Sequence, residues 1–265
     1  MKNETSWLEN LEKLLDASVP AYPALQQTLF EAERYSLLQG GKRVRPVLCG
    51  AFCELCGADA GRALWFAAGV EMIHTYSLIH DDLPCMDDDD LRRGKPTNHV
   101  VYGASLATLA GDGLLTFAFE LMASQKGIAP DKLNRCIAVI AKAAGPAGMV
   151  GGQAIDLESE GHRIPMETLR KMHMGKTGAL FRAALRSGAI LAGASEKQLA
   201  ALTAYAEGFG LAFQITDDIL DVTGDEKLIG KPVGSDIRNE KSTYVTLTSL
   251  DEAQRLAEET VDKAV

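Results

Sequence analysis

Aromatic residues and positive charge are both scarce in this 265-residue chain. Phe, Trp and Tyr make up 6% of the sequence, and 27 Lys and Arg residues stand against 36 Asp and Glu, a formal net charge of −9. Such a chain lacks the basic surface that binds nucleic-acid phosphates, so we expect no nucleic-acid partner. Hydrophobic residues are plentiful at 46%, and the abundant Ala and Leu have high helix propensity. The composition excludes a disordered chain and favours a helical protein with a large core.

Long apolar runs are also missing. The first 15 residues alternate charge with Leu and contain no apolar segment of a signal peptide. The longest uncharged apolar stretch begins near Val100 and ends at Asp112, too short to span a membrane. The chain has five cysteines, an odd number, and a protein of this length needs no disulfides for stability. We therefore expect no membrane span, reduced thiols and a cytoplasmic location.

Strand signals are a third absence, because neither alternating hydrophobicity with hairpin turns nor a βαβ pattern occurs. Helical spacing of apolar residues recurs instead, interrupted by Pro and Gly. The expected helices cover about residues 7–15, 22–38, 46 onward, 60–83, 104–124, 130–145, 165–186, 196–223 and 241 onward, with glycine-rich loops at 145–152 and 224–234. We predict one all-α domain over residues 1–265, without internal repeats.

The acidic excess is confined to two clusters. They comprise Asp81, Asp82, Asp87, Asp88, Asp89 and Asp90, and then Asp217, Asp218 and Asp221. Without these nine, the chain would hold 27 acidic residues, equal to its 27 basic ones. The first cluster ends an apolar helix, where carboxylates are unfavourable unless cations compensate. Pro84 cannot continue the helix, so we expect Asp87 to Asp90 to turn back. Taken alone, this cluster is equally well explained as a solvated acidic loop.

The second cluster favours a metal site. Asp217 and Asp221 are four residues apart and share one helix face, where like charges repel. The residues around them are apolar, which argues against free solvation of that face. Oxygen ligands without histidine favour Mg²⁺. We therefore predict that the two clusters hold Mg²⁺ together.

Cations that attract phosphate lie close to the first cluster. Segment 40–46, Gly-Gly-Lys-Arg-Val-Arg-Pro, joins a glycine-rich loop, three cations and the start of a helix, whose free N–H groups attract anions. Segment 92–95, Arg-Arg-Gly-Lys, follows the acidic cluster directly. Because Mg²⁺ usually bridges carboxylate to phosphate, both segments indicate a phosphorylated substrate. Salt bridges to neighbouring Asp are the alternative, plausible for Arg92 and Arg93 and weak for the glycine loop.

Together, these motifs resemble those of the trans-isoprenyl diphosphate synthases. An Asp-Asp-x4-Asp segment precedes an Asp-Asp-x-x-Asp segment, and the supporting segments are 40–46, 91–94 (Leu-Arg-Arg-Gly), 151–157 (Gly-Gly-Gln-Ala-Ile-Asp-Leu) and 174–178 (Met-Gly-Lys-Thr-Gly). They keep the family's order and spacing over nearly the whole chain, and the likeness is greatest to bacterial short-chain members of the farnesyl diphosphate synthase type. Such enzymes usually continue through further C-terminal helices, so we expect this chain to lack part of that sequence.

The resemblance implies a fold and a reaction. The fold is the isoprenoid synthase type, a bundle of long helices around a deep central cavity, in a homodimer. The reaction is the head-to-tail condensation of isopentenyl diphosphate with dimethylallyl or geranyl diphosphate. Three Mg²⁺ ions, bridged by substrate, would assist it.

The resemblance also implies roles for individual residues. Metal would be held by Asp81, Asp87 and Asp217, with Asp82, Asp218 and Asp221 as direct or supporting ligands and Asp88 as an alternative to Asp87. Isopentenyl diphosphate would be bound by Lys42, Arg45, His74 and Arg93, and the allylic diphosphate by Arg92, Lys176, Lys231 and Lys241. Thr177 and Gln214 would direct oxygen dipoles toward the carbocation, which completes a catalytic set of Asp81, Asp87, Lys176, Thr177, Gln214 and Asp217.

Product length depends on what closes the hydrocarbon pocket below Asp81. Tyr76 lies about 7.5 Å below Asp81 along an ideal helix but about 140° around it, and Ser77 faces the same side but is small. Periodicity alone therefore does not aim Tyr76 at the pocket. The resemblance favours a fifteen-carbon product, because members with a longer first Asp motif and an aromatic residue five positions before it tend to stop there. A geranylgeranyl diphosphate synthase is the alternative.

Other interpretations have less support. A terpene cyclase shares the ionisation step but usually has an Asn/Asp-Ser/Thr-Glu pattern in the second motif. An inactive helical subunit would not need both Asp clusters.

Three other motifs suggest different sites. Cys49, Cys53 and Cys56 have an iron–sulfur spacing, yet they share one helix face, which favours core packing. Gly175-Lys176-Thr177 resembles a P-loop, but Arg170 stands where that motif requires Gly. His74 and His80 are of a metal-ligand type, and the resemblance makes His74 a diphosphate contact.

Overall fold

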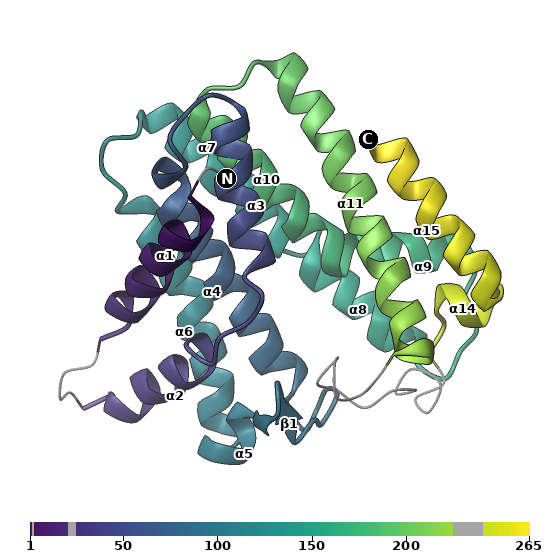
Figure 1. Ribbon diagram of the computed structural model, residues 1–265. Coiled ribbons are helices and arrows are strands. Elements are labelled where there is room, and N and C mark those ends of the chain that lie inside the picture. The colour runs from purple at the N-terminus through teal and green to yellow at the C-terminus, as the bar shows by residue number, and fades with distance from the viewer. Residues whose placement is uncertain (2, 21–24, 225–240) are drawn as a thin grey trace. The chain divides into compact units, whose positions relative to one another are not determined.

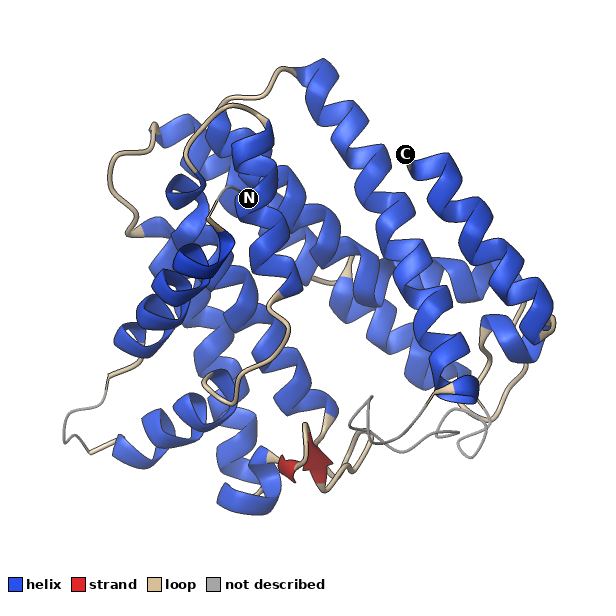
Figure 2. Ribbon diagram, viewed as in Figure 1, coloured by secondary structure: helices blue, strands red, loops and turns tan. Residues whose placement is uncertain are grey.

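The computed structural model describes residues 1, 3–20, 25–224 and 241–265, and its regular structure is almost entirely helical (Figures 1 and 2). The all-α prediction is confirmed. By its internal contacts the chain divides into two compact units, residues 1–137 with 187–194 and residues 138–186 with 195–265. The single domain with a deep central cavity stays a prediction.

The first unit is organised around one buried helix, α4. Its elements are α1 (Glu4–Ser18), α2 (Gln27–Leu37), α3 (Val44–Leu55), the 3-10 helix η1 (Ala60–Ala63), α4 (Leu64–Asp81), β1 (Leu91–Arg92), β2 (Lys95–Pro96), α5 (Asn98–Tyr102), α6 (Ala104–Ala123), the first part of α7 (Pro130–Ala144) and the end of α10 (Ala179–Ala192) from Ser187 on. α4 packs against α1, α2, α3 and, most extensively, α6. Gly69 lets α4 and α6 approach closely, since a Cβ there would lie 2.6 Å from Met122 Cγ. Full burial of a side chain such as Phe66 or Ile73 contributes about 1.5–3 kcal/mol, so this helix pair forms the core of the unit.

α6 is the one helix in the described part of the chain that is long and apolar enough to cross a membrane. It continues past Asp112, as the predicted helix over 104–124 does, so Asp112 ends the uncharged apolar stretch but not the helix. Ala107, Ala110 and Leu114 are buried, and the helix packs against α4, α2 and α5. Core helices of soluble proteins meet the same criteria of length and composition, so α6 is weak evidence for a span.

The second unit is built around α11. Its elements are the end of α7, α8 (Met149–Ser159), α9 (Met166–His173), the π-helical turn η2 (Met174–Gly178), the part of α10 (Ala179–Ala192) before Ser187, α11 (Glu196–Thr223), α14 (Tyr244–Leu247) and α15 (Leu250–Ala264). Ser195 begins α11 with a capping box that includes Gln198. α11 and α15 lie side by side (Figure 1). The core of this unit contains Leu169, Met172, Ile215, Tyr244 and Ala253.

Some predicted elements are confirmed and others are wrong. α6, α7 and α11 follow the expected ranges closely. The expected loop at 145–152 is wrong in part, because α8 begins at Met149, and the expected helix over 165–186 is interrupted by the π turn. The expected loop at 224–234 lies outside the described residues after Gly224. The absence of hairpins is also wrong, since β1 and β2 pair antiparallel, but strands of two residues are too short to show alternation.

All five cysteines are free thiols. Cys49 and Cys53 are fully buried in α3, and burial raises the pKa of the Cys53 thiol to about 11. Core packing therefore explains Cys49 and Cys53, as predicted, whereas Cys56 follows the end of α3 and is half-buried.

Candidate functional site

The first acidic cluster is a turn that brings Asp87 back to Asp81. Asp81 is the last residue of α4, and the backbone N–H of Asp87 donates to the Asp81 carbonyl over 2.9 Å. The N–H groups of Met86 and Asp88 both donate to the Leu83 carbonyl, at 2.8 and 3.2 Å. The predicted turn is confirmed. Asp81 is half-buried and Asp87 is exposed, so the turn presents two neighbouring carboxylates with access to water.

Asp82 lies on the inner side of this turn and binds Arg92. The carboxylate accepts from Arg92 Nε at 2.7 and 2.9 Å and also forms a close contact with Nη2. Burial raises the pKa of Asp82, and Arg92 offsets part of that effect. A cavity of about 20 Å³, enough for one water molecule, lies beside this pair. The metal role of Asp82 stays a prediction, and in the structure its carboxylate is the counter-ion of Arg92.

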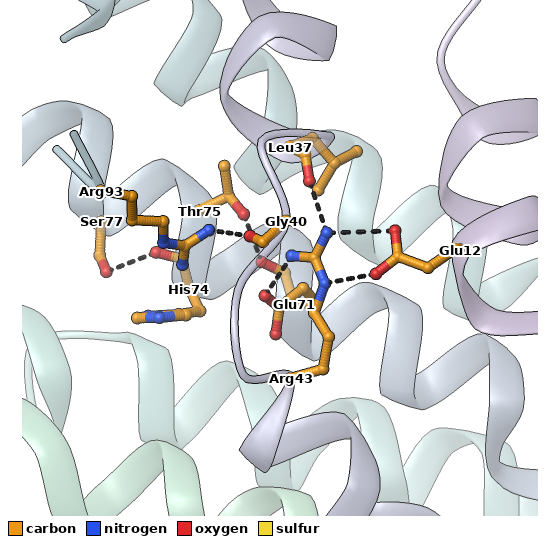
Figure 3. Close-up of polar contacts among 9 residues, drawn as sticks. All are labelled: Glu12, Leu37, Gly40, Arg43, Glu71, His74, Thr75, Ser77 and Arg93. Carbon is orange, nitrogen blue, oxygen red and sulfur yellow. Dashed lines mark hydrogen bonds and ion pairs between the residues drawn. The ribbon is translucent and has the colours of Figure 1, made fainter. Parts of the chain in front are cut away.

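A tight hairpin turn places the next cation, Arg93, over the glycine loop. Arg93 and Gly94 have φ of 54° and 74°, the positive values that a type I′ turn requires. The Arg93 guanidinium binds the Gly40 carbonyl (Figure 3). Gly41 has φ of 138°, and a Cβ there would lie 2.8 Å from Arg93 Cζ. Gly41 therefore leaves room for the arginine to approach the loop.

His74 lies among these arginines and is electrically neutral. Burial lowers its pKa well below the usual value, and the positive charges of Arg45 and Arg93 lower it further. Burial also lowers the pKa of Arg45, to about 10. Lys42 is exposed at the start of the same segment. The structure thus brings the predicted isopentenyl diphosphate residues Arg45, His74 and Arg93 into one electropositive cluster with an uncharged imidazole.

The second unit holds Lys176 and Thr177 in the π turn. π turns are rare and frequently occur at functional sites. Lys176 Nζ lies 2.5 Å from Asp156 Oδ2 of α8. Burial raises the pKa of Asp156, but Lys176, Lys241 and His173 outweigh it, and the carboxyl pKa falls below its ordinary value. Lys176 and Lys241, two predicted allylic-diphosphate cations, therefore lie within electrostatic range of one carboxylate.

Glycines set the position of the π turn. A Cβ on Gly152 would lie 2.0 Å from Lys176 N, and a Cβ on Gly210 would lie 3.0 Å from Gly178 Cα. α8 and α11 thus pack backbone to backbone against the turn. In the Gly-Gly pair of α8, Gly152 serves this contact, whereas Gly151 lies against Pro146, whose carbonyl oxygen would be 2.1 Å from a Cβ there.

The second acidic cluster lies in the last two turns of α11. Asp217 is half-buried, whereas Asp218 and Asp221 are buried. Asp218 Oδ2 accepts from the Tyr244 N–H over 2.7 Å and so satisfies a free donor at the start of α14. Gln214 and Thr177 are half-buried. Lys231 lies outside the described residues.

The donor chemistry of both clusters suits Mg²⁺, although no group of three or more possible ligands converges among the described residues. Mg²⁺ takes oxygen ligands, keeps several waters and is commonly held by one or two carboxylates plus substrate phosphates. Asp81 with Asp87, and Asp217 at the other cluster, supply such a partial set. The two clusters belong to different units, so the shared site stays a prediction.

The residues expected to set product length face different neighbours. The ring of Tyr76 is buried and meets His80 edge to face, with centroids 5.6 Å apart. His80 Nε2 in turn lies 3.0 Å from the Thr108 carbonyl of α6. Ser77 Oγ donates to the His74 carbonyl over 2.8 Å. Tyr76 therefore packs beside the α4–α6 contact, and its role in product length stays a prediction.

Sequence reasoning missed Asp156, Gln153 and the partners of Arg43. Both polar atoms of the Gln153 side chain are buried without a hydrogen-bond partner in the described part of the chain. The signal was available, because Gln153 and Asp156 are three residues apart on α8 and share one helix face. Glu71 gave no signal, since a single carboxylate in an apolar helix does not reveal its partner.

Comparisons with known proteins find a family model, relatives and solved structures that are similar to this chain. A family model described as polyprenyl synthetase matches residues 26–265. The chain is 49% identical over 259 residues to a geranylgeranyl diphosphate synthase of Cyanophora paradoxa, covering 97% of this chain and 85% of that protein. Among solved structures it resembles an FPP/GFPP synthase from Zymomonas mobilis (TM-score 0.88, 39% identity) and a geranylgeranyl pyrophosphate synthetase from Pyrococcus horikoshii (TM-score 0.90, 36% identity). Each comparison covers 99% of this chain and 90% of the other.

Proposed function

This chain belongs to the polyprenyl synthetase family, and on that premise we propose that it condenses isopentenyl diphosphate head-to-tail with an allylic diphosphate. One observation carries the proposal: a single end of α4 has both the Asp81–Asp87 turn and the arginine cluster around neutral His74. Carboxylates suited to Mg²⁺ and cations suited to an anion thus lie on the same part of α4 in the first unit, which supports the proposal. Together these are the two requirements of a diphosphate substrate.

The reaction begins with cleavage of the allylic C–O bond, which leaves diphosphate and a delocalised carbocation. Mg²⁺, held by Asp81, Asp87 and Asp217, would neutralise the charge that develops on the leaving group. Arg92, Lys176 and Lys241 bind the same diphosphate through charge-assisted hydrogen bonds. The oxygens of Thr177 and Gln214 would direct their dipoles toward the positive carbon.

The second substrate then reacts with the cation. Lys42, Arg45, His74 and Arg93 hold isopentenyl diphosphate, whose terminal alkene carbon forms the new C–C bond with the allylic cation. Loss of one proton to the departed diphosphate restores a double bond, so charge and atoms balance. The neutral imidazole of His74 donates a hydrogen bond without adding a positive charge near the cation.

We propose geranylgeranyl diphosphate, with twenty carbons, as the main product. The name of the Cyanophora paradoxa relative supports this length, and the earlier expectation of farnesyl diphosphate becomes the second candidate. Tyr76 favours the second candidate, because it is an aromatic residue five positions before Asp81. Its packing against His80, beside α6, weakens that argument.

Chromatography of products made from dimethylallyl and geranyl diphosphates with labelled isopentenyl diphosphate tests the proposal. A twenty-carbon product supports it, and a fifteen-carbon product identifies the second candidate. If farnesyl diphosphate is the wild-type product, Tyr76→Ala should lengthen it, whereas Ser77→Phe should shorten either product. Release of diphosphate without isopentenyl diphosphate would instead indicate a cyclase, and no release at all an inactive subunit.

Dependence on Mg²⁺, a homodimer and a cytoplasmic location are further parts of the proposal. Loss of turnover with a chelator, restored by Mg²⁺, tests the first. Sedimentation of the full chain tests the second, and a dimer mass is expected. Imaging of a tagged chain in its host cell tests the third.

A further inference from the structure

Arg43, which follows the glycine loop directly, hydrogen-bonds to residues of α1, α2 and α4. It precedes α3 with φ of 47°, a left-handed conformation that residues other than glycine rarely adopt. Its Nη1 donates to Glu71 of α4 over 2.6 Å, and its Nε donates to Glu12 of α1 over 2.8 Å. Nη2 donates to the Leu37 carbonyl at the end of α2 over 2.9 Å, as Figure 3 shows. Each of the three guanidinium nitrogens therefore donates to protein, and Nη2 also donates to Glu12.

Glu71 is the carboxylate at the centre of the arginine cluster. Its side chain is 3% exposed and forms an ion pair with Arg43. Its charge also acts on Arg45 and Arg93. One buried carboxylate thus faces three guanidinium groups, and a second, Glu12, satisfies Arg43 from the other side.

The charge balance separates Arg43 from its neighbours. Two carboxylates neutralise Arg43, so it has little charge left for an incoming anion. The charge of Glu71 also acts on Arg45 and Arg93, and His74 is neutral. Arg45 and Arg93 are therefore the charged groups that we expect to meet an incoming anion.

We propose that Arg43 and Glu71 are positioning residues for isopentenyl diphosphate. Their ion pair holds the segment from Gly40 to Arg45 against α4, and so fixes Lys42 and Arg45 relative to His74 and Arg93. The proposal rests on the proposed function and names residues that act through the substrate contacts, without touching substrate.

The first test compares the kinetics of Arg43→Lys and Glu71→Gln with wild type, varying each substrate separately. Displacement of substrate contacts by about 1 Å is enough to cost large factors, so KM for isopentenyl diphosphate should rise about tenfold or more. The KM for the allylic diphosphate and kcat should stay within about threefold. Arg34→Gln is the matched control, because Arg34 likewise joins α2 to the end of α1 through the Asp16 and Val19 carbonyls, and it should leave both KM values unchanged.

The double variant Arg43→Leu/Glu71→Leu separates positioning from folding. It removes one positive and one negative charge, and replacing both members of a buried ion pair commonly preserves stability. With wild-type thermal unfolding, a raised KM for isopentenyl diphosphate supports positioning. A KM restored to the wild-type value would mean that the pair serves the fold alone, and a change confined to the allylic substrate would also overturn the proposal. A wild-type enzyme that does not consume isopentenyl diphosphate would refute the proposed function itself.

Discussion

At the scale of single residues, identical side chains of one motif have different partners. Asp81 and Asp87 are linked through the backbone and reach solvent, whereas Asp82 is buried against Arg92. The sequence predicts a carboxylate cluster and its turn. It does not predict which carboxylate is taken by an arginine, because that choice depends on the hairpin that brings Arg92 back to the helix end.

This difference predicts different defects for Asp81→Ala and Asp82→Asn. Asp81→Ala should lower kcat by about a thousandfold with unchanged thermal unfolding, because it removes charge stabilisation at the leaving group. Asp82→Asn should lower the free energy of unfolding by about 1.5–3 kcal/mol, the contribution of hydrogen bonds to a charged group. The apparent affinity for Mg²⁺, measured by titration of activity, should change in Asp81→Ala and stay near wild type in Asp82→Asn. Equal shifts in both variants would make Asp82 a metal ligand.

At the scale of elements, α8 and the π turn depend on the absence of a side chain at Gly152. A Cβ there would lie 2.0 Å from Lys176 N, a backbone atom that cannot move aside as cheaply as the end of a flexible side chain. Gly152→Ala should therefore lower the free energy of unfolding by about 1–3 kcal/mol. It should also lower kcat, since Lys176 moves with the turn. Ala154→Ser, at an exposed position of the same helix, is the control, and equal stability of the two variants would contradict the contact.

The contact between α2 and α6 contains a buried carboxyl, Glu33. Burial raises its pKa from the ordinary 4.5 to about 7. Its Oε1 lies 2.2 Å from the position that a Cβ on Gly113 would occupy. Between these pKa values the folded chain binds more protons than the unfolded chain. The stabilising effect of the neutral carboxyl is thus complete below pH 4.5 and is lost as pH rises through 7.

Glu33→Gln should remove this pH dependence. It should raise the free energy of unfolding by about 1–3 kcal/mol at pH 8 and change it little at pH 4.5. Chemical denaturation at the two pH values measures the difference. Glu31 is exposed on the same helix, so Glu31→Gln should change the free energy of unfolding equally at the two pH values. If Glu33→Gln raised the free energy of unfolding as much at pH 4.5 as at pH 8, the titration argument would be contradicted.

Long helices were predictable and short elements were not. α11 follows its capping residue Ser195 and carries helical spacing for 28 residues, so its range could be predicted. The hairpin occupies two residues on each side, and the π turn adds one residue to an otherwise regular pattern. The hairpin depends on the positive φ of Arg93 and Gly94, and the π turn on a close backbone contact at Gly152. Sequence periodicity encodes neither feature.

At the scale of the whole molecule, the acidic residues that set the net charge lie in two compact units. The first unit holds the Asp81–Asp90 cluster, and the second holds the cluster on α11. Sequence reasoning from charge repulsion predicts that both serve one metal site. Kinetic coupling tests this without any assumption about geometry.

The double variant Asp81→Ala/Asp217→Ala should lose little more turnover than either single variant. Groups that act as one unit give strongly non-additive losses, because removing any member disables the whole. The measurement is kcat for the wild type, both single variants and the double variant at saturating Mg²⁺. Losses that multiply would indicate two independent sites.

The π turn also constrains how many residues can separate α9 from α10. Each residue advances a helix by about 100°, so one residue removed from Met174–Gly178 would rotate α10 by that angle relative to α9. Phe181, fully buried with its ring centroid 5.1 Å from that of Phe209, would leave its place, and Leu169 and Met172 would keep theirs. Insertions and deletions are therefore forbidden between Met172 and Phe181. In related chains that keep both faces buried, the number of residues across this interval is a stricter constraint than their identities.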